Sequence, residues 1–398
     1  ATTADNNVAI GKSAMENVTS GSNNVAIGKE ALDSNTTADN NTAIGRAALG
    51  ANTTGTDNVA VGTNTLKTAT TATRNTAVGM DSMQALTTGS YNTGCGERTL
   101  YADTTGTENT ALGYLALDAC TTGSYNVGLG VNALGSVTTA NYNTAIGTGA
   151  MISATTGALN VAIGPFAGDG LTTASQNIAI GYNALSAACG NSNVAVGSAA
   201  LSVATGSSNT AVGDVSLNNH TSGDNNVAGY QNTSVGKSSL DANTTGVANT
   251  AMGFGALGAN TTANYNTAFG WNALDANTTG TTNVAMGANA LGTVTTGSQN
   301  TSIGLNAGGS ITTGGNHLML GYDSGNSGSP GGAITTGNNE VTIGNSSHSK
   351  INTQVSITVA SDERDKTDFA DLDLGLAFVN QLAPVTYKWD KRAKYVDW

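Results

Sequence analysis

A strict repeat runs through almost the whole chain and limits its possible folds more than any other feature. The repeat is organised around a five-residue stretch, seen in its plainest form as Asn41-Thr42-Ala43-Ile44-Gly45. Of the 19 steps between successive closing glycines, 15 are 17 residues long, two are 16 and two are 23. A period of this length predicts a repeat architecture in which each unit packs only on its neighbours. The closing glycines stand at positions 11, 28, 45, 62, 79, 96, 113, 130, 147, 164, 181, 197, 213, 236, 253, 270, 287, 304, 321 and 344.

The five-residue stretch has the pattern of a short β-strand. Its second and fourth positions are β-branched or apolar, as at Val161 and Ile163, whereas the third is usually Ala. This period of two predicts a strand with one apolar face and one face of small side chains. We expect the apolar face to be buried, so Asp in place of Ile163 should disrupt its coil by burying an unpaired charge.

The first and last positions of the stretch are Asn and Gly. Asn opens 18 of the 20 copies, and His317 and Glu340 replace it in the last two. Stacked amide side chains can hydrogen-bond from one coil to the next, so the Asn column predicts a structural ladder. The Gly suits a turn at positive φ or the close approach of another backbone. The ladder is expected to include Asn24, Asn41, Asn58, Asn160, Asn249 and Asn283.

The remaining residues of each repeat complete one coil. Four residues after the Gly stands a second apolar position, such as Leu49, and a polar turn follows, such as Thr53-Thr54-Gly55. Each unit therefore reads as a strand, a tight turn, a second short strand and a wide polar turn. Residues 1–344 are predicted to form an all-β parallel β-solenoid, or β-roll, of about 20 coils.

Each coil can bury little by itself, which predicts both stacking and chain association. A coil offers only about three apolar side chains, so it is stable only against its neighbours. At roughly 4.8 Å per coil, the stack would span on the order of 95 Å. The small face, with Ala at the third position, would let the backbones of different chains pack closely. We therefore expect a homotrimeric fibre.

The composition argues against several classes of partner and cofactor. The formal net charge is −12 and charged residues make up 10% of the chain, which disfavours nucleic acid or anionic lipid as a partner. No run of about 18 apolar residues is present, so no membrane-spanning helix is predicted. The histidines His220, His317 and His348 lack metal-ligand spacing, so neither a metal nor another cofactor is expected. Most acidic side chains should be solvated.

The three cysteines are expected to be free thiols. Cys95 occupies the fourth position of its stretch, whereas Cys120 and Cys189 fall in the polar turns of distant repeats. In a solenoid these sites are several coils apart, which is too far for a disulfide. The sequence therefore indicates assembly in a reducing compartment.

Two irregular features leave a choice between a structural and a binding role. The two 23-residue steps each add six residues, around Gly229 and from Asp323 to Gly332. These insertions are predicted to be surface loops, with receptor contact as the alternative. Four tyrosines precede the ladder position, where they could pack against the coil or stack on sugar rings. They are Tyr91, Tyr125, Tyr142 and Tyr265.

The repeat ends at Gly344, and the composition then changes. Residues 345–360 alternate like a strand leading out of the solenoid, and residues 361–398 form a different, short α/β segment. This segment contains Ser361-Asp362-Glu363-Arg364-Asp365-Lys366, then Gly375-Leu376, then Leu382-Ala383-Pro384-Val385-Thr386-Tyr387-Lys388-Trp389.

These motifs resemble the opening of the endosialidase-type intramolecular chaperone, a self-cleaving domain at the end of many phage tail fibres and tailspikes. Residues 361–398 would be the N-terminal part of such a domain. The resemblance implies that the domain helps three chains to trimerise and is then cut off at Ala360–Ser361. It further implies that Ser361 is the nucleophile and Lys366 its base, since a lysine of depressed pKa can activate a hydroxyl.

The repeat itself is similar to the head repeats of trimeric autotransporter adhesins, which carry an Asn-x-Val/Thr-Ala-Ile-Gly motif on a β-roll. The repeat here is longer because its wide turn is longer. The resemblance implies a left-handed roll, and the residue spacing alone does not give the handedness.

Together these features predict a structural and adhesive trimeric phage tail fibre, located in the virion tail and assembled in the host cytoplasm. Its expected partners are itself, other virion tail proteins and a host receptor, either a glycan or a surface protein. One alternative is a bacterial trimeric adhesin on the cell surface. Another is a polysaccharide-cutting tailspike, which needs paired carboxylates that the sequence does not offer. A third is an ice-binding solenoid, which the adjacent, differently directed Thr pairs disfavour.

Overall fold

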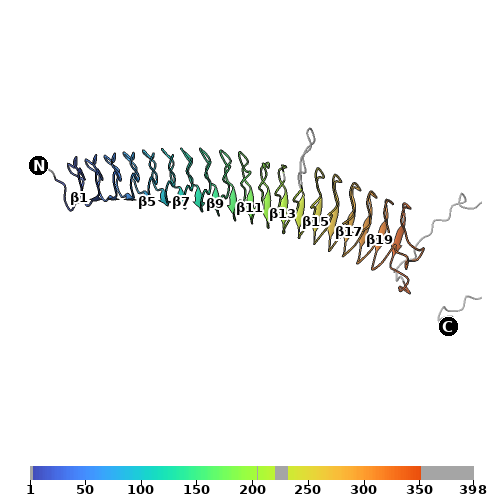
Figure 1. Cartoon of the computed structure of the whole chain (residues 1–398). Coiled ribbons are helices and arrows are strands. Elements are labelled where there is room, and N and C mark those ends of the chain that lie inside the picture. The colour runs from blue at the N-terminus through green and yellow to red at the C-terminus, as the bar shows by residue number, and fades with distance from the viewer. Residues whose placement is uncertain (1–2, 204, 220–231, 351–398) are drawn as a thin grey trace, which may run out of the picture. The chain divides into compact units, whose positions relative to one another are not determined.

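The structure, a computed structural model, describes residues 3–203, 205–219 and 232–350. The chain divides into two compact units, Ala1–His348 and Ser349–Trp398, and the described residues lie almost entirely in the first. Within these residues the secondary structure consists of twenty three-residue strands and no helix (Figure 1). The predicted all-β class is confirmed. The strands are β1 (Val8–Ile10), β2 (Val25–Ile27), β3 (Thr42–Ile44), β4 (Val59–Val61), β5 (Thr76–Val78), β6 (Thr93–Cys95), β7 (Thr110–Leu112), β8 (Val127–Leu129), β9 (Thr144–Ile146), β10 (Val161–Ile163), β11 (Ile178–Ile180), β12 (Val194–Val196), β13 (Thr210–Val212), β14 (Thr233–Val235), β15 (Thr250–Met252), β16 (Thr267–Phe269), β17 (Val284–Met286), β18 (Thr301–Ile303), β19 (Leu318–Leu320) and β20 (Val341–Ile343).

Successive strands pair in parallel and in register, so each coil adds one strand to a single sheet. Ala43 of β3 lies opposite Ala26 of β2 and Ala60 of β4, and the same register continues along the stack. The 16-residue and 23-residue steps do not disturb it, because β11 pairs with β12, β13 with β14, and β19 with β20. The extra residues from Asp323 to Gly332 therefore lie outside the strands, and the insertion around Gly229 is outside the described residues. The parallel β-solenoid with its 17-residue repeat is confirmed.

Each coil contains one strand, whereas the sequence predicted two. The second apolar segment is a series of turns in which alternate residues have positive φ, such as Ala47 (56°) and Leu49 (49°). A bulky L-residue in this region normally costs on the order of 1–2 kcal/mol. Hydrogen bonds between coils stabilise this backbone conformation, since the Leu49 N–H donates to the Thr65 carbonyl of the next coil at 3.0 Å. The repeat of apolar residues in the sequence does not reveal that the backbone of this segment has positive φ at alternate residues.

The strand's inward face is the opposite of the predicted one. Ala162 of β10 is 0% exposed, whereas its neighbour Ile163 is 38% exposed. In most coils the third position faces a narrow interior, and the larger Met319 of β19 is accommodated there opposite Gly325. A Cβ atom added at Gly94, which takes that position in β6, would lie 2.7 Å from Thr99 Oγ1. The prediction that Ile163→Asp buries a charge within its own chain is therefore wrong.

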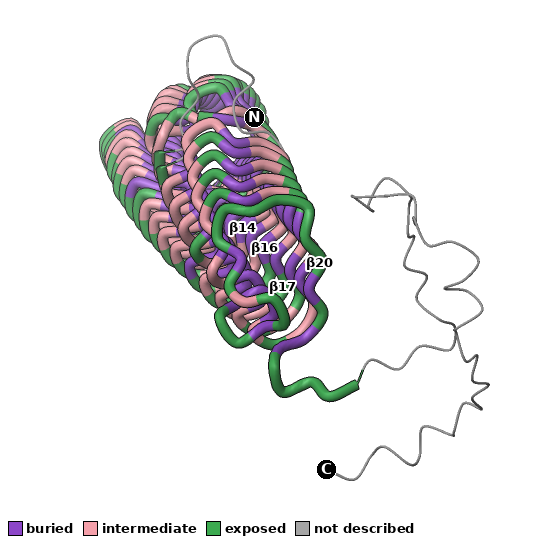
Figure 2. The backbone as a smooth tube through the Cα atoms, turned by 90° about the vertical axis from the view of Figure 1, so that its right-hand side faces the viewer, coloured by how far each residue is buried: buried purple, intermediate pink, exposed green. Residues whose placement is uncertain are grey.

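The core is a set of columns made by the same few positions of every coil. Viewed along the stack, buried and exposed residues repeat from coil to coil (Figure 2). The buried columns contain the third-position Ala, the ladder Asn, and the Ala-Leu pair, such as Ala48 and Leu49. The core is thin, so interlocking bonds between coils must supply much of the stability.

The closing glycine is required by its conformation and by close contact, as the sequence predicted. Gly45 has φ of 138°, a region that side-chain-bearing residues rarely adopt. An added Cβ there would lie 2.3 Å from the carbonyl oxygen of Gly62 in the next coil.

The ladder asparagines are buried and use both ends of the amide. Asn41 Nδ2 donates to the Gly55 carbonyl at 2.9 Å, and its Oδ1 accepts the Asn58 backbone N–H at 3.0 Å. Asn58 Nδ2 also donates to Asn41 Oδ1 at 3.1 Å. Each amide thus binds neighbouring coils through backbone groups that would otherwise be buried without partners. The other residues expected in the ladder are buried as well: Asn24, Asn160, Asn249 and Asn283.

The described part of the predicted neck, residues 345–350, contains no strand. The rest of the predicted neck and all of residues 361–398 lie outside the described residues. The first unit ends at His348, close to the predicted boundary at residue 344.

Candidate functional site

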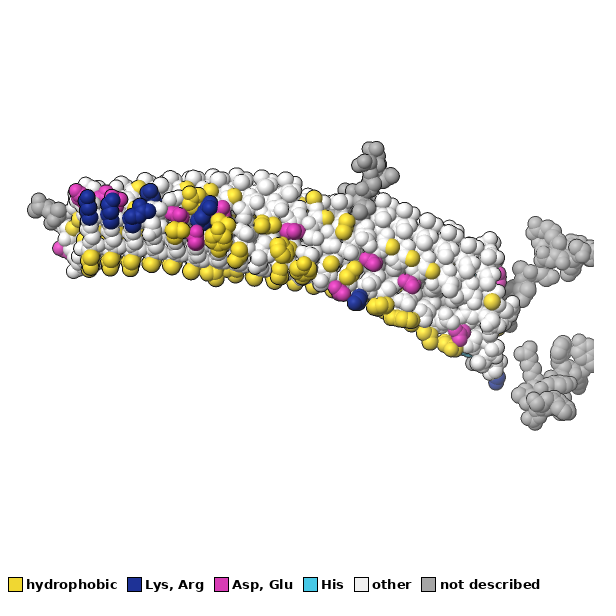
Figure 3. Space-filling model, in the orientation of Figure 1, with side chains coloured by type: hydrophobic (Ala, Val, Ile, Leu, Met, Phe, Trp, Pro, Cys, Tyr) yellow, Lys and Arg dark blue, Asp and Glu magenta, His cyan; other side chains and the backbone are white. Residues whose placement is uncertain are grey.

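The outward strand face creates an exposed apolar seam. We define the seam as the large apolar side chains that stand immediately before and after the closing glycines and are exposed. Figure 3 shows hydrophobic side chains following one edge of the stack. Before the glycine, the seam contains Ile10, Ile44, Val78, Leu112, Ile146, Ile163, Phe269, Met286, Ile303 and Ile343. After the glycine, it contains Met80, Tyr114, Val131, Tyr182, Phe254, Trp271, Leu305 and Tyr322.

The seam has the character of an interaction surface. Trp271 and Phe269 are each 51% exposed on either side of one glycine, and similar pairs recur along the stack. Scattered apolar residues on a protein surface need no explanation, but contiguous apolar patches mark binding surfaces. Because the strands are in register, the two seam positions recur once per coil, and most coils carry an exposed large apolar side chain at one or both of them.

The tyrosines that precede the ladder position are exposed, and two of them stack on each other. The rings of Tyr125 and Tyr142 are 4.8 Å apart with an interplanar angle of 7°. The guanidinium of Arg74 lies 5.3 Å from the ring centre of Tyr91. Ring faces covered in this way are less available to sugars, which favours the packing interpretation for Tyr91, Tyr125 and Tyr142.

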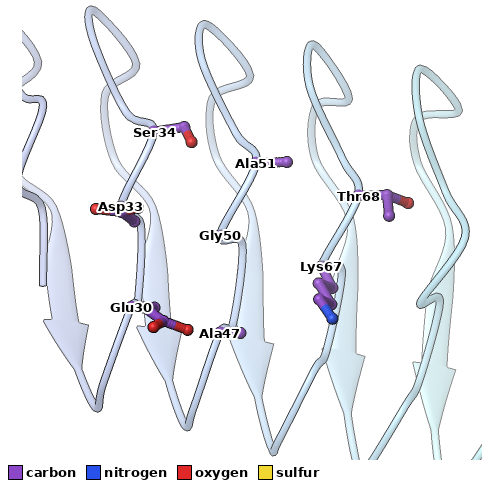
Figure 4. Close-up of a pocket in the computed structure, with 8 residues that line it drawn as sticks. All are labelled: Glu30, Asp33, Ser34, Ala47, Gly50, Ala51, Lys67 and Thr68. Atoms are coloured by element: carbon purple, nitrogen blue, oxygen red, sulfur yellow. The ribbon is translucent and has the colours of Figure 1, made fainter. Parts of the chain in front are cut away.

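The surface formed by the turn segments that follow the closing glycines carries a shallow hollow near the N-terminal end of the stack (Figure 4). Its volume is ≈ 290 Å³, and it exists because Ala47, Gly50 and Ala51 are small. Glu30 and Asp33 line it, but their side chains point in different directions. Burial raises the pKa of Asp33, and the Lys29 side chain lowers the pKa of Glu30. Glycoside hydrolysis requires two carboxylates directed at one bond, and the two carboxylates that line this hollow are not arranged in that way.

One acidic side chain lies inside the core, contrary to the expectation that acidic residues are mostly solvated. Asp103 is 0% exposed; its Oδ1 accepts the Gly106 N–H at 2.8 Å, and its Oδ2 has no hydrogen-bond partner. Burial raises the pKa of this carboxyl to about 7. The sequence carried one signal of this burial, because Asp103 occupies the repeat position at which other coils have a buried Asn, such as Asn52.

The three cysteines are free, as expected, but their environments differ. Cys95 is exposed and belongs to the outward strand face. Cys120 is in the core rather than on a polar turn, and burial raises its pKa to about 12. Cys189 is partly buried, and desolvation raises its pKa to about 11. Only Cys95 therefore combines access to solvent with a place on the outward face.

Two of the three predicted isolated histidines are described. His317 occupies the ladder position, and His348 lies beyond β20, whereas His220 is outside the described residues. In the described ranges, no three or more His, Cys, Asp or Glu side chains are grouped to hold a metal ion. The same ranges contain no helix that is long and apolar enough to cross a membrane. The predicted nucleophile Ser361 and base Lys366 lie outside the described residues.

Comparison with known families identifies the C-terminal segment. Residues 361–397 match the family model described as chaperone of endosialidase (Peptidase_S74). This match confirms the resemblance of the Ser361 to Trp389 motifs to the endosialidase-type intramolecular chaperone. A β-solenoid followed by this segment fits a tail fibre with an endosialidase-type chaperone domain. A search of curated proteins found no match to the chain.

Proposed function

We propose that the chain forms the shaft of a homotrimeric phage tail fibre, in which the apolar seams of three copies pack together. The observation that carries this proposal is the seam, which recurs in most coils of a solenoid that precedes a chaperone-of-endosialidase segment. The fibre would lie in the virion tail, contact other tail proteins and attach to a host glycan or surface protein.

A second copy of this chain is the partner that best fits the seam. A surface whose positions recur at the coil spacing, over many coils, is covered along its length best by a partner with the same spacing. Copies of one chain have that spacing and can close around an axis parallel to the stack. The number three comes from the chaperone family, whose members help three chains to associate. Packing would involve the Ile and Val side chains of the seam, and not the Ala face that the sequence suggested.

The mass of the native particle tests the assembly directly. We expect a particle of three chains in native mass measurements, compared with the denatured mass of one chain. A monomeric particle would contradict the fibre proposal and leave the seam without its partner.

Thiol labelling locates the interface, because the native Cys95 stands on the outward face. In the assembled particle we expect Cys95 to resist a maleimide, whereas in urea all three thiols should react. Buried Cys120 and partly buried Cys189 have raised pKa values and should stay silent in the native state.

The matched control is Cys95→Ser combined with Thr54→Cys, which places one thiol in an exposed wide turn. This introduced thiol should react in the assembled particle as well as in urea. If Cys95 of the wild type reacted as readily in the native particle as the introduced thiol does in the variant, an interface at the outward strand face would be ruled out.

Self-cleavage at Ala360–Ser361 is the one covalent step that we propose. The Lys366 amine takes the Ser361 hydroxyl proton while Oγ attacks the Ala360 carbonyl carbon. The peptide C–N bond breaks, an ester forms, and water then hydrolyses it. The products are a carboxylate at Ala360 and a free amine at Ser361.

The mass of the denatured chain tests this step in the full-length natural protein. A chain ending at Ala360 is expected, and Ser361→Ala should leave the bond intact. Ser347→Ala, in the described part of the predicted neck, should still be cut. Cleavage of Ser361→Ala at an unchanged rate would exclude Ser361 as the nucleophile, and the fibre proposal would be unaffected.

A further inference from the structure

The last two coils are joined by a histidine at the ladder position, where the earlier coils have an asparagine. In the preceding rung, Asn300 Nδ2 donates to the Gly314 carbonyl at 3.0 Å, and Asn300 Oδ1 accepts the His317 N–H at 3.0 Å. His317 repeats both contacts with its ring. Its Nε2 lies 2.7 Å from the Gly337 carbonyl oxygen, and its Nδ1 faces the Glu340 N–H at 3.3 Å.

Only one form of the imidazole satisfies both contacts. Nε2 faces a carbonyl, so it must carry a hydrogen, and Nδ1 faces an N–H, so it must accept. This is the neutral tautomer with its hydrogen on Nε2. Protonation would place an N–H on Nδ1 opposite the Glu340 N–H and remove the acceptor. His317 is only 2% exposed, so water cannot easily replace the lost partner.

The coil that depends on this junction has few other attachments. Strand β20 pairs with β19 alone among the described strands, and Val341 and Ile343 are exposed. The Leu318 N–H bond to the Glu340 carbonyl and the Gly344 N–H bond to the Leu320 carbonyl flank the histidine. A lost hydrogen bond therefore weakens a coil that, among the described residues, pairs with a neighbouring strand on one side.

The charged groups around this junction do not restore the lost acceptor. Coil 18, residues 300–316, has no charged side chain, and the coil of His317 contributes Asp323. The last coil and the residues after it contribute Glu340, His348 and Lys350. The exposed Glu340 carboxylate would attract an imidazolium, but it cannot accept the hydrogen of its own backbone N–H at Nδ1.

We propose that His317 is a pH-sensitive latch whose protonation releases the last coil of the solenoid. Histidine changes its charge between about pH 5 and 8, so mild acid opens the latch and neutral pH closes it. This proposal stands on the geometry of one junction and does not depend on the trimeric fibre.

Hydrogen exchange of the full chain at pH 7.5 and pH 5.5, corrected for intrinsic exchange rates, tests the latch. We expect the protection of the amides in residues 340–344 to fall by up to about tenfold at the lower pH. The Asn-joined rung at Val284–Met286 should keep its protection and serves as the internal reference.

Two variants separate His317 from its neighbour. His317→Asn restores the residue used in the earlier rungs, so protection of residues 340–344 should become independent of pH. His348→Asn removes the other histidine nearby and should keep the acid response. Equal protection of the wild type at both pH values would overturn the proposal. So would an acid response that persists in His317→Asn or disappears in His348→Asn.

Discussion

Replacing Leu134 by Asp should open its coil and the coils on either side. Leu134 is 0% exposed and lies in the Ala-Leu column, so Asp would place an unpaired charge in the core. We expect the local free energy of unfolding to fall by at least about 4 kcal/mol. Leu134 has φ of 55°, a conformation that Asp tolerates better than Leu, so the loss reports burial and not backbone strain. Hydrogen exchange of β8 and β9 measures it.

Ile163→Asp is the matched control, because the same residue is introduced at an apolar position that faces outward. We expect β10 to keep most of its exchange protection while the particle loses mass towards a single chain. The two variants together separate the core from the proposed interface. If Ile163→Asp removed as much protection as Leu134→Asp within the monomer, the strand face would be inward, contrary to the structure.

Asp103→Asn should stabilise the solenoid at neutral and alkaline pH. Burial raises the pKa of Asp103 from its usual 3.8 to about 7, so the folded state favours the protonated form. As pH rises from about 4 to about 7, the unfolded chain releases this proton first and stability falls. The total loss is on the order of 4 kcal/mol above pH 7. Asn stays neutral and can donate to the Gly106 carbonyl, as Asn52 does to Gly55.

Urea unfolding at pH 5 and pH 8, followed through exchange of the Thr110–Leu112 amides, measures this effect. The wild type should be less stable at pH 8 than at pH 5 around this coil, and the difference should largely disappear in Asp103→Asn. Asp57→Asn changes an exposed carboxylate and should leave the difference in place. An identical pH dependence in wild type and Asp103→Asn would show that the buried carboxyl is not its source.

The C-terminal segment was identified from the sequence because its signal lies in residue identities. The spacing of Ser361, Arg364 and Lys366, with Pro384 and Trp389 further on, is specific enough to be recognised without coordinates, and the family match covers it. Whether Ser361 and Lys366 meet is a matter of tertiary geometry and stays a prediction. The buried acid and the histidine junction could not be predicted, because their chemistry depends on which neighbours surround Asp103 and His317.

The sequence by itself determined the number of coils, the in-register stacking of the five-residue stretch and the roles of Asn and Gly, because these follow from a strict period and from backbone chemistry. It did not determine which strand face is inside. Alternation of Thr42, Ala43 and Ile44 defines two faces equally well in either orientation. The tertiary structure decided the matter through the width of the coil, since the turn segment with Leu49 lies close across from the strand and leaves room for a small side chain such as that of Ala43. The larger side chains consequently face outward and form the seam.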